Sequence, residues 1–330
     1  MNFSFIIPVY NRPDEIEELL HSLAKQNYDH DFEIVIVEDG SSIPCEEVIN
    51  TFRDKLNISY FFKENSGPGD SRNFGMKNAK GDYFLILDSD CILPSNYLSE
   101  AEKALTENFA DCFGGPDNAL DSFTDIQKAI NFAMTSLLTT GGIRGGSEKI
   151  DKFQPRSFNM GLSKKAFEAS NGFGNIHPGE DPDLSIRLWK MNFETKLFSK
   201  VFVYHKRRID WSKFYKQVNK FGKARPILNS WYPEYNKLTY FFPSAFLVGF
   251  LFSILFFIFG IELFLILYGI YFIAILISST IKNRSFSIGI LSVFAVAMQF
   301  YGYGIGFIKS YFNIILLKKK PQSAFPELFF

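Results

Sequence analysis

Short apolar runs and amphipathic segments alternate along the first hundred residues. Strands are predicted at 3–9, 32–37, 58–62 and 83–87, with a helical segment after each of the first three. The first of these helices opens at Pro13-Asp14, and its apolar residues recur at helical spacing on one face: Ile16, Leu19, Leu20 and Leu23. Strands that alternate with helices in this way predict an α/β fold with a mostly parallel sheet.

The pattern changes after residue 115. The sequence predicts a helix at 120–138, a loop at 139–146, a strand at 157–162, helices at 164–169 and 181–190, and a strand at 201–204. Four glycines in the loop resist regular structure, so it is either a lid over a site or a plain linker. Residues 211–229 mix Trp, Tyr and Lys in the manner of a helix that lies at a membrane interface.

Two long apolar stretches follow. Glu262 is the only charged residue between Leu238 and Ile281, and none lies between Ser285 and Ile308. Because about 20 apolar residues cross a bilayer as a helix, the first stretch holds two spans and the second holds one. The turn between the first two is expected at 260–262. We therefore expect a first domain at 1–230, in halves at 1–115 and 116–230, a membrane region at 238–308 and a tail at 309–330.

Basic residues before and after the spans indicate orientation. Six of them precede the first span: Lys206, Arg207, Arg208, Lys223, Arg225 and Lys237. The positive-inside rule puts the first domain in the cytoplasm, and 282–284 return to that side after two spans. A third span would carry Lys309 and 318–320 outside, against the rule. Either three spans exist, which the length of 285–308 favours, or 285–317 bend at the glycines of 302–306 as a re-entrant pair.

Composition excludes some classes of function. The chain has 330 residues, 35 basic and 35 acidic, so it lacks the basic surplus that a nucleic-acid partner requires. Cys45, Cys91 and Cys112 show no metal-binding spacing and are expected to be buried thiols in a reducing compartment. The N-terminus is a strand without a basic leader. We expect a multi-pass protein of the cell (inner) membrane whose first domain is cytoplasmic.

One pair of carboxylates stands where a metal would bind. The apolar run 83–87 ends on Asp88-Ser89-Asp90. In an open α/β sheet, ligands collect beyond the carboxyl ends of the strands. Oxygen ligands with partial hydration suit Mg²⁺ or Mn²⁺, which bind through one or two carboxylates together with substrate phosphates. The alternative is a solvated turn that caps the next helix.

Several motifs in order give the chain a resemblance to a known family. They are Phe-Ile-Ile-Pro-Val-Tyr-Asn (5–11), Val-Glu-Asp-Gly-Ser-Ser (37–42), Gly-Pro-Gly-Asp-Ser-Arg-Asn-Phe-Gly (67–75), Leu-Asp-Ser-Asp (87–90), Gly-Glu-Asp-Pro-Asp-Leu (179–184) and Tyr-His (204–205). Over roughly residues 1–225 the chain resembles glycosyltransferase family 2, enzymes of GT-A fold that transfer sugars from nucleotide donors. Each motif is weak alone, and the series is specific. The resemblance implies a nucleotide-sugar donor, with a preference for uridine, and Mn²⁺ or Mg²⁺.

The resemblance also implies donor-binding residues. Pro8 and Tyr10 would wall the base, since an aromatic face stacks on a heterocycle. Asp39 would accept a hydrogen bond from the base; its alternative is a turn carboxylate that caps the amides of Ser41 and Ser42. Arg72 would lie near the base and diphosphate, where a planar guanidinium fits; its alternative is a surface position on a helix. Asp88 would contact the ribose or the metal.

The remaining implied roles concern the metal and catalysis. Asp90 would hold the metal, and His205 resembles a third metal ligand or is a structural hydrogen-bonding residue. Asp181 resembles the general base, which deprotonates the acceptor hydroxyl and so gives inversion in a single displacement. Glu180 would help to position the acceptor. The alternative for Asp181 is acidity at a helix N-terminus, which the macrodipole favours.

Four functions remain open on these residues. The first is an inverting transferase that acts on a lipid-linked or growing glycan acceptor at the membrane. The second is a polyprenyl-phosphate sugar synthase, although that class usually lacks an acceptor subdomain with the Gly-Glu-Asp signature. The third is a processive polysaccharide synthase, for which Arg207, Arg208 and Trp211 match the expected element only loosely. The fourth is a membrane subunit that binds a nucleotide sugar without catalysis.

Overall fold

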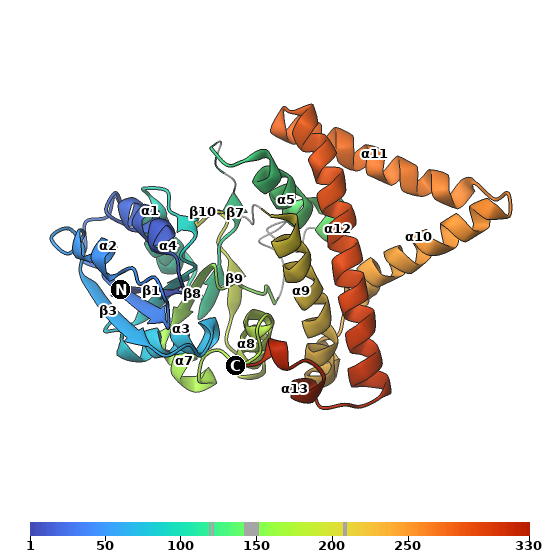
Figure 1. Cartoon of the computed structure of the whole chain (residues 1–330). Helices are drawn as coiled ribbons and strands as arrows, with labels where there is room; N and C mark the ends of the chain where they lie inside the picture. The colour runs from blue at the N-terminus through green and yellow to red at the C-terminus, as the bar shows by residue number, and fades with distance from the viewer. Residues whose placement is uncertain (119, 121, 142–151, 207–209) are drawn as a thin grey trace. The chain divides into compact units, whose positions relative to one another are not determined.

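The structure is a computed structural model that describes the chain except residues 119, 121, 142–151 and 207–209. The predicted loop at 139–146 and the residues Arg207 and Arg208 therefore lie wholly or partly outside the described residues. The chain forms two compact units. The first comprises 1–118, 145–206 and 330, and the second comprises 119–144 and 207–329 (Figure 1).

The first unit is an α/β unit. Its strands are β1 (Phe3–Val9), β2 (Glu33–Asp39), β3 (Ile58–Lys63), β4 (Tyr83–Leu87), β5 (Cys91–Ile92), β6 (Cys112–Gly114), β7 (Asp117–Asn118), β8 (Asn159–Ser163), β9 (Thr195–Leu197) and β10 (Val203–His205). Its helices are α1 (Pro13–Leu23), α2 (Glu46–Asn50), α3 (Pro68–Asn78), α4 (Tyr97–Glu107), α7 (Lys164–Ser170) and α8 (Glu180–Lys190).

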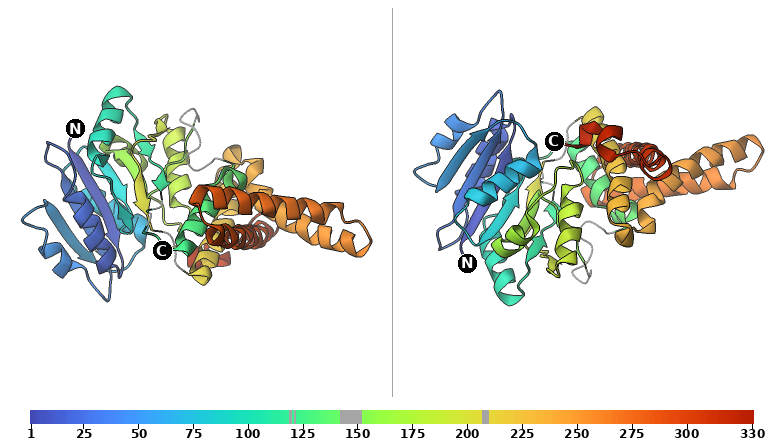
Figure 2. Two further views of the ribbon diagram at one scale, coloured as in Figure 1. Left: turned by 90° about the horizontal axis from the view of Figure 1, so that it is seen from above. Right: turned by 90° about the horizontal axis from the view of Figure 1, so that it is seen from below.

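A seven-stranded sheet with the order β3-β2-β1-β4-β8-β6-β9 forms the centre of this unit. All neighbours are parallel except β8, which runs antiparallel to β4 and β6. Side chains alternate between the two faces of each strand. Thus Phe5 and Ile7 pack with α1 and α4, whereas Ile6 packs with α3, α7 and α8. Helices consequently cover both faces of the sheet (Figure 2).

A three-stranded sheet of order β5-β10-β7 joins three distant segments of the chain. β10 pairs antiparallel with β5, and in this register His205 lies opposite Cys91. The amide of Lys206 also donates to the carbonyl of Asp90 at 3.0 Å. The end of β10 is thereby fixed beside the Asp-Ser-Asp segment.

The predicted α/β fold with a mostly parallel sheet is confirmed. The strands expected at 3–9, 32–37, 58–62 and 83–87 correspond to β1–β4, and those at 157–162 and 201–204 correspond to β8 and β10. The sequence did not predict β5, β6, β7 or β9, which have two or three residues each. Strands that short show no periodicity, so only their partners define them.

The second unit is helical. It contains α5 (Asp125–Thr135), α6 (Leu137–Thr140), α9 (Trp211–Trp231), α10 (Phe242–Ile258), α11 (Leu263–Asn283), α12 (Phe286–Tyr311) and α13 (Pro321–Ala324). Short 3₁₀ turns lie at Pro233–Tyr235, Leu238–Phe241 and Pro326–Leu328, and a π-helical turn follows α12 at Phe312–Leu316. The turn expected at 260–262 does separate α10 from α11.

Three helices in this unit are long and apolar enough to cross a membrane: Leu238–Ile258, Leu263–Asn283 and Phe286–Leu316. They coincide with the stretches found in the sequence. Helix α12 runs without interruption through Gly302, Gly304 and Gly306, so the bend considered for a re-entrant pair is not present. These glycines instead allow close packing, since a Cβ on Gly306 would lie 2.3 Å from the carbonyl oxygen of Asn219 in α9.

The compact units follow other boundaries than the domains expected from the sequence. Helix α5 falls within the predicted acceptor half, yet its residues Ile130, Phe132, Ala133 and Met134 share one apolar cluster with α9, α11 and α12. The amphipathic pattern of α5 showed that one face is buried. It did not show which part of the chain covers that face.

Candidate active site

The predicted donor-binding residues follow three adjacent parallel strands. β1, β2 and β4 are neighbours in the sheet, so their carboxyl ends lie at one edge. Pro8 lies near the end of β1, and Tyr10 follows it with 53% of its surface exposed. Asp39 ends β2, and Asp88 follows β4 directly. An exposed aromatic ring at this edge is available for stacking on a ligand.

Asp39 is buried and organises the loop that follows β3. Its Oδ1 accepts from Lys63 Nζ at 2.7 Å and from the Ser66 amide at 3.0 Å, and its Oδ2 accepts from the Gly67 amide at 3.0 Å. The amide of Ser42 binds the side chain of Asn11 instead, at 2.8 Å, so Asp39 does not form the cap considered above. A carboxylate offers about four acceptor sites, and the role of Asp39 toward a base stays a prediction.

Arg72 joins two carboxylates from different elements. Arg72 is 3% exposed, which excludes the surface position considered above. Nη2 lies 2.7 Å from Asp88 Oδ1, and Nη1 lies 3.4 Å from Glu180 Oε1. The guanidinium also lies 5.3 Å from the centre of the Phe173 ring. Arg72 thus connects the end of β4 with the start of α8.

Glu180 and Asp181 differ in their environments although they are neighbours. Glu180 accepts from the Gly179 amide at 2.9 Å and pairs with His177 Nδ1 at 2.7 Å. Burial disfavours its charged form, but His177 and Arg72 outweigh burial and hold the pKa of Glu180 at about 2. Burial and then the charge of Glu180 raise the pKa of Asp181 to about 6, against the opposing effect of Arg72.

The Oδ1 atom of Asp181 is buried and has no hydrogen-bond partner among the described residues. A buried acceptor without a partner costs free energy unless a ligand or water satisfies it. A raised pKa makes the same carboxylate a better proton acceptor near neutral pH. Both properties are compatible with the role of general base that the resemblance implied for Asp181, and that role stays a prediction.

Asp90 and His205 come together as candidate metal ligands. His205 Nε2 lies 3.1 Å from Asp90 Oδ1, and Cys91 supplies a third donor, all within 4.8 Å of one another. His205 Nδ1 lies 4.0 Å from Asp117 Oδ2, which is beyond hydrogen-bond distance. Carboxylate oxygens and imidazole nitrogens are both common ligands of divalent metal ions in proteins. This donor set fits a divalent cation.

Asp88 is not part of that group, because its carboxylate is directed to Arg72. Its contact with a metal or a ribose stays a prediction. Two residues that the sequence did not single out do enter the site. Arg12 Nη1 donates to Asp90 Oδ2 at 2.7 Å, and His177 pairs with Glu180. Arg12 follows the Pro-Val-Tyr-Asn motif directly, which was the signal that could have identified it.

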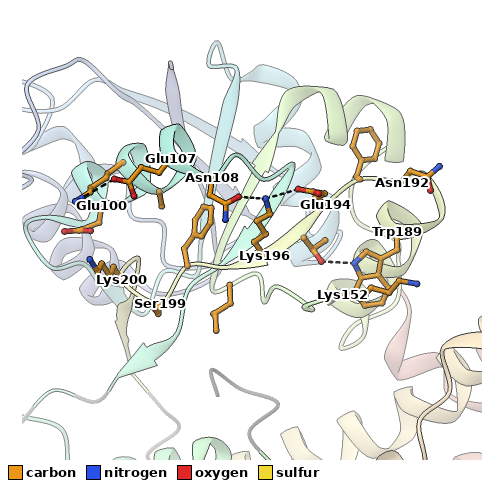
Figure 3. A pocket seen from close by; sticks show the side chains of 16 residues that line it. Glu100, Glu107, Asn108, Lys152, Trp189, Asn192, Glu194, Lys196, Ser199 and Lys200 are labelled. Carbon is orange, nitrogen blue, oxygen red and sulfur yellow. Dashed lines mark hydrogen bonds and ion pairs between the residues drawn. The ribbon is translucent and has the colours of Figure 1, made fainter. Parts of the chain in front are cut away.

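A pocket of about 790 Å³ lies elsewhere on this unit, between the end of α4, the edge strand β9 and the end of α8 (Figure 3). None of the predicted site residues lines it. Its charged groups are mostly engaged with one another: Lys196 Nζ lies 2.8 Å from Glu194 and 2.7 Å from Asn108. This pocket therefore does not compete with the carboxylate site as a catalytic centre.

Comparison with known proteins places this geometry in a family. The model of glycosyl transferase family 2 matches residues 4–170, half of the chain. Poly(ribitol-phosphate) beta-N-acetylglucosaminyltransferase TarS of Staphylococcus aureus is 38% identical over 114 residues, which are 34% of this chain and 20% of that protein. An uncharacterized glycosyltransferase of Rickettsia typhi is 44% identical over 104 residues, which are 32% of each protein.

Solved structures show the same fold. A mannosyltransferase of Pyrobaculum calidifontis, in complex with GDP-Man and Mn²⁺, has a TM-score of 0.54 at 17% identity and covers 68% of this chain and 64% of that chain. Residues 1–349 of S. aureus TarS with UDP have a TM-score of 0.50 at 20% identity, covering 97% of this chain and 92% of that one. With a GT-A fold and a family match over half of its length, this chain belongs to glycosyl transferase family 2.

Proposed function

We propose that the chain is an inverting glycosyltransferase that moves a sugar from a nucleotide sugar, UDP-linked, to a lipid-linked or growing glycan acceptor at the cytoplasmic face of the cell membrane. The observation that carries this proposal is the Oδ1 atom of Asp181, which is buried without a partner among the described residues. An acceptor hydroxyl would satisfy this atom by donating a hydrogen bond and then its proton.

Asp181 acts as the base while its neighbours keep it in place. Glu180 holds Arg72 and His177, and its negative charge keeps the pKa of Asp181 high enough to accept a proton. As Asp181 removes the proton, the acceptor oxygen attacks the anomeric carbon and the nucleoside diphosphate leaves from the opposite face. One displacement inverts the configuration, and no covalent intermediate with the chain forms.

The donor would bind along the edge formed by β1, β2 and β4. Tyr10 and Pro8 would enclose the base, Asp39 would accept from it, and Arg72 with Asp88 would lie beside the ribose and diphosphate. Two solved neighbours support a nucleotide donor, since one was obtained with GDP-Man and Mn²⁺ and the other with UDP. Uridine and the choice of sugar are part of the proposal.

Asp90 and His205 would hold Mn²⁺ or Mg²⁺, with Asp88 as a further contact. A bound divalent cation offsets the charge that develops on the leaving diphosphate. The pairing of β10 with β5 holds His205 Nε2 3.1 Å from Asp90 Oδ1, which directly precedes β5. Both metal ligands would thus be in place before the nucleotide sugar binds.

The test is a binding and turnover assay on the detergent-solubilised full chain. Among nucleoside diphosphates added with Mn²⁺, UDP should raise the melting temperature most, because a ligand that binds only the folded state stabilises it. Release of nucleotide from a panel of UDP-sugars then reports transfer to water or to an added acceptor. If no nucleoside diphosphate raises the melting temperature, a nucleotide-sugar donor is wrong. If one binds but no acceptor supports turnover, the non-catalytic alternative holds.

A further inference from the structure

Helices α10 and α11 have the properties of membrane-embedded segments. Their segments have mean hydropathies of 2.4 and 2.2, and only 6% and 11% of the residues in their most apolar windows are buried in the protein. Most of their large apolar side chains are exposed, and the buried residues are Ser244 and Ser253 in α10 and Ile275 and Ser279 in α11. A helix that is apolar on every face and uncovered by protein is stable only in lipid.

Helix α12 differs from these two, although it was expected to be a third span. Its mean hydropathy is 1.6, and 44% of its apolar window is buried. It lies along α9: Phe214 and Val218 share a cluster with Ala295, Val296 and Phe300. Further along, a Cβ on Gly222 would lie 2.2 Å from the carbonyl oxygen of Tyr303. Helix α9 therefore covers the middle of α12.

The charged residues of α9 determine whether α12 can cross the bilayer. Five cations lie along this helix: Lys213, Lys216, Lys220, Lys223 and Arg225. If α12 crossed the bilayer, its middle would lie at the centre of the hydrocarbon core and α9 would lie beside it. Charged side chains at that depth are costly and need a partner or water. The packing of α9 is therefore incompatible with a perpendicular α12.

The exposed face of α12 is a continuous apolar stripe. Its members are Phe286, Ile290, Phe294, Tyr301, Ile305 and Ile308, and Phe312 and Leu316 of the following π-helical turn continue it. Their spacings of three, four and seven residues place them on one side of the helix. The opposite side carries small residues such as Ser292, Gly302 and Gly306, which contact protein. A helix with one lipid-facing stripe and one protein-covered face suits the plane of the membrane interface.

The segment after α12 returns to α9. Glu327 forms an ion pair of 2.9 Å with Lys223, whose ammonium also lies 5.7 Å from the centre of the Phe325 ring. The rings of Phe329 and Trp231 are 6.4 Å apart. Lys223 precedes α10 in the chain and Glu327 follows α12. An odd number of membrane crossings between these two residues would put them on opposite sides of the bilayer. Their pairing requires an even number.

Both ends of the α10–α11 hairpin rest on α12. Ser244 Oγ near the start of α10 donates to the Gly304 carbonyl at 3.3 Å, and Ser279 near the end of α11 pairs with Ser292 at 2.7 Å. From these points the two helices extend away from α12 and meet at the turn by Phe259, which is 74% exposed. Helix α11 has 21 residues, or about 31 Å, the thickness of the hydrocarbon core.

We propose that, within the described second unit, the hairpin of α10 and α11 is the part that crosses the bilayer, that α12 lies along the membrane surface beneath α9, and that residues 312–329 lie on the same side as α9. This inference rests on the membrane location in the proposed function and refines it. It replaces three crossings with two, and it puts Lys318, Lys319 and Lys320 on the side that the positive-inside rule expects.

Cysteine labelling on intact cells tests the sidedness. The native Cys45, Cys91 and Cys112 are buried and provide a low background. Single cysteines are introduced at three exposed positions: Asp31→Cys in the first unit, Ile261→Cys at the hairpin turn and Ser323→Cys after α12. With a membrane-impermeant maleimide, Ser323→Cys and Asp31→Cys should give the same result, both labelled or both protected. Ile261→Cys should give the opposite result. If Ser323→Cys reacts together with Ile261→Cys, the inference is overturned.

Depth measurements test the position of α12 independently. Nitroxide labels at Ile290, Tyr301 and Phe312, which are 40%, 51% and 51% exposed on the same stripe, should all lie at one shallow depth in liposomes. A label at Ile273 in the middle of α11 is the deep control. If the Tyr301 label lies as deep as that control while the other two lie near opposite interfaces, α12 spans the membrane and the inference is overturned.

The two tests separate this inference from the proposed function. Relative sidedness of Asp31 and Ser323 tests only the number of crossings, whether or not the chain transfers sugar. If both positions react from outside, the cytoplasmic location in the proposed function is wrong while the even number of crossings stands. If all three labelled chains stay in the soluble fraction, membrane association itself is refuted.

Discussion

The carboxylate pair at the start of α8 makes a quantitative prediction about pH. Burial and the charge of Glu180 raise the pKa of Asp181 to about 6. A general base acts only in its deprotonated form, so turnover should fall as the pH drops through that value. Glu180 itself stays ionised over the whole range, because its pKa is held at about 2.

The size of the effect follows from the ionised fraction. With a pKa of about 6, Asp181 is roughly 90% ionised at pH 7 and roughly 10% ionised at pH 5, so kcat should fall roughly tenfold. An aspartate with an ordinary pKa of about 3.9 would still be roughly 90% ionised at pH 5 and would lose almost no activity. The two cases differ enough for a direct measurement to separate them.

The assay is kcat from pH 5 to 8 at saturating donor, Mn²⁺ and acceptor. Calorimetry of nucleotide binding at each pH ensures that loss of donor binding is not counted as loss of the base. Glu180→Gln should move the midpoint to lower pH, since it removes a charge that raises the pKa of Asp181. A flat profile between pH 7 and pH 5 in the wild-type chain would refute the assignment.

Substitution of the base itself provides the second half of this test. Asp181→Asn should retain donor affinity and lose roughly 10² to 10⁴ in kcat, the usual contribution of a general base. The matched control is Asp14→Asn, which removes an acidic residue from the first turn of another helix, α1. If both variants lose similar small amounts of activity, Asp181 serves only the helix macrodipole and another residue is the base.

Three further substitutions and one control variant address the metal and the helix packing. Asp90→Ala should abolish the enhancement of nucleotide binding by Mn²⁺ in calorimetry while the chain stays folded, and equal enhancement would contradict the metal assignment. Arg12→Gln should strengthen Mn²⁺ binding roughly tenfold in the absence of nucleotide, because it removes a cation 2.7 Å from Asp90; unchanged Mn²⁺ affinity would count against this. Gly306→Ala should lower the melting temperature in detergent, since its Cβ would lie 2.3 Å from the Asn219 carbonyl oxygen, whereas Gly269→Ala, with nothing within 4 Å, should leave it unchanged. Equal melting temperatures of the two glycine variants would contradict the close packing of α9 and α12.

The sequence predicted features that depend on local pattern. Strands β1, β2 and β4 are buried along almost their whole length and appear as apolar runs. The motifs after β2, β3 and β4 led to the prediction of Asp39, Arg72 and Asp90 as site residues. Contacts between residues far apart in the sequence could not be predicted from local pattern. The contact of Arg12 with Asp90 joins residues 78 positions apart, and no periodicity encodes it.

Hydropathy has a similar limit in the second unit. It counts apolar residues in a window and does not register which face another helix covers. For α10 and α11 this makes no difference, because almost nothing covers them. For α12 it does, because α9 covers the side that carries Gly302 and Gly306, and only the exposed stripe remains for lipid.

Two separate stretches of the chain form the second unit, and this has a practical consequence for protein production. Helix α5 lies at 125–135, between segments of the first unit, and buries Ile130, Phe132 and Met134 against helices that begin at residue 211. A truncation that deletes everything after residue 206 would leave this apolar face uncovered, and such a fragment is expected to aggregate. A soluble catalytic fragment would also need polar replacements on α5, so removing the C-terminal helices alone is not enough.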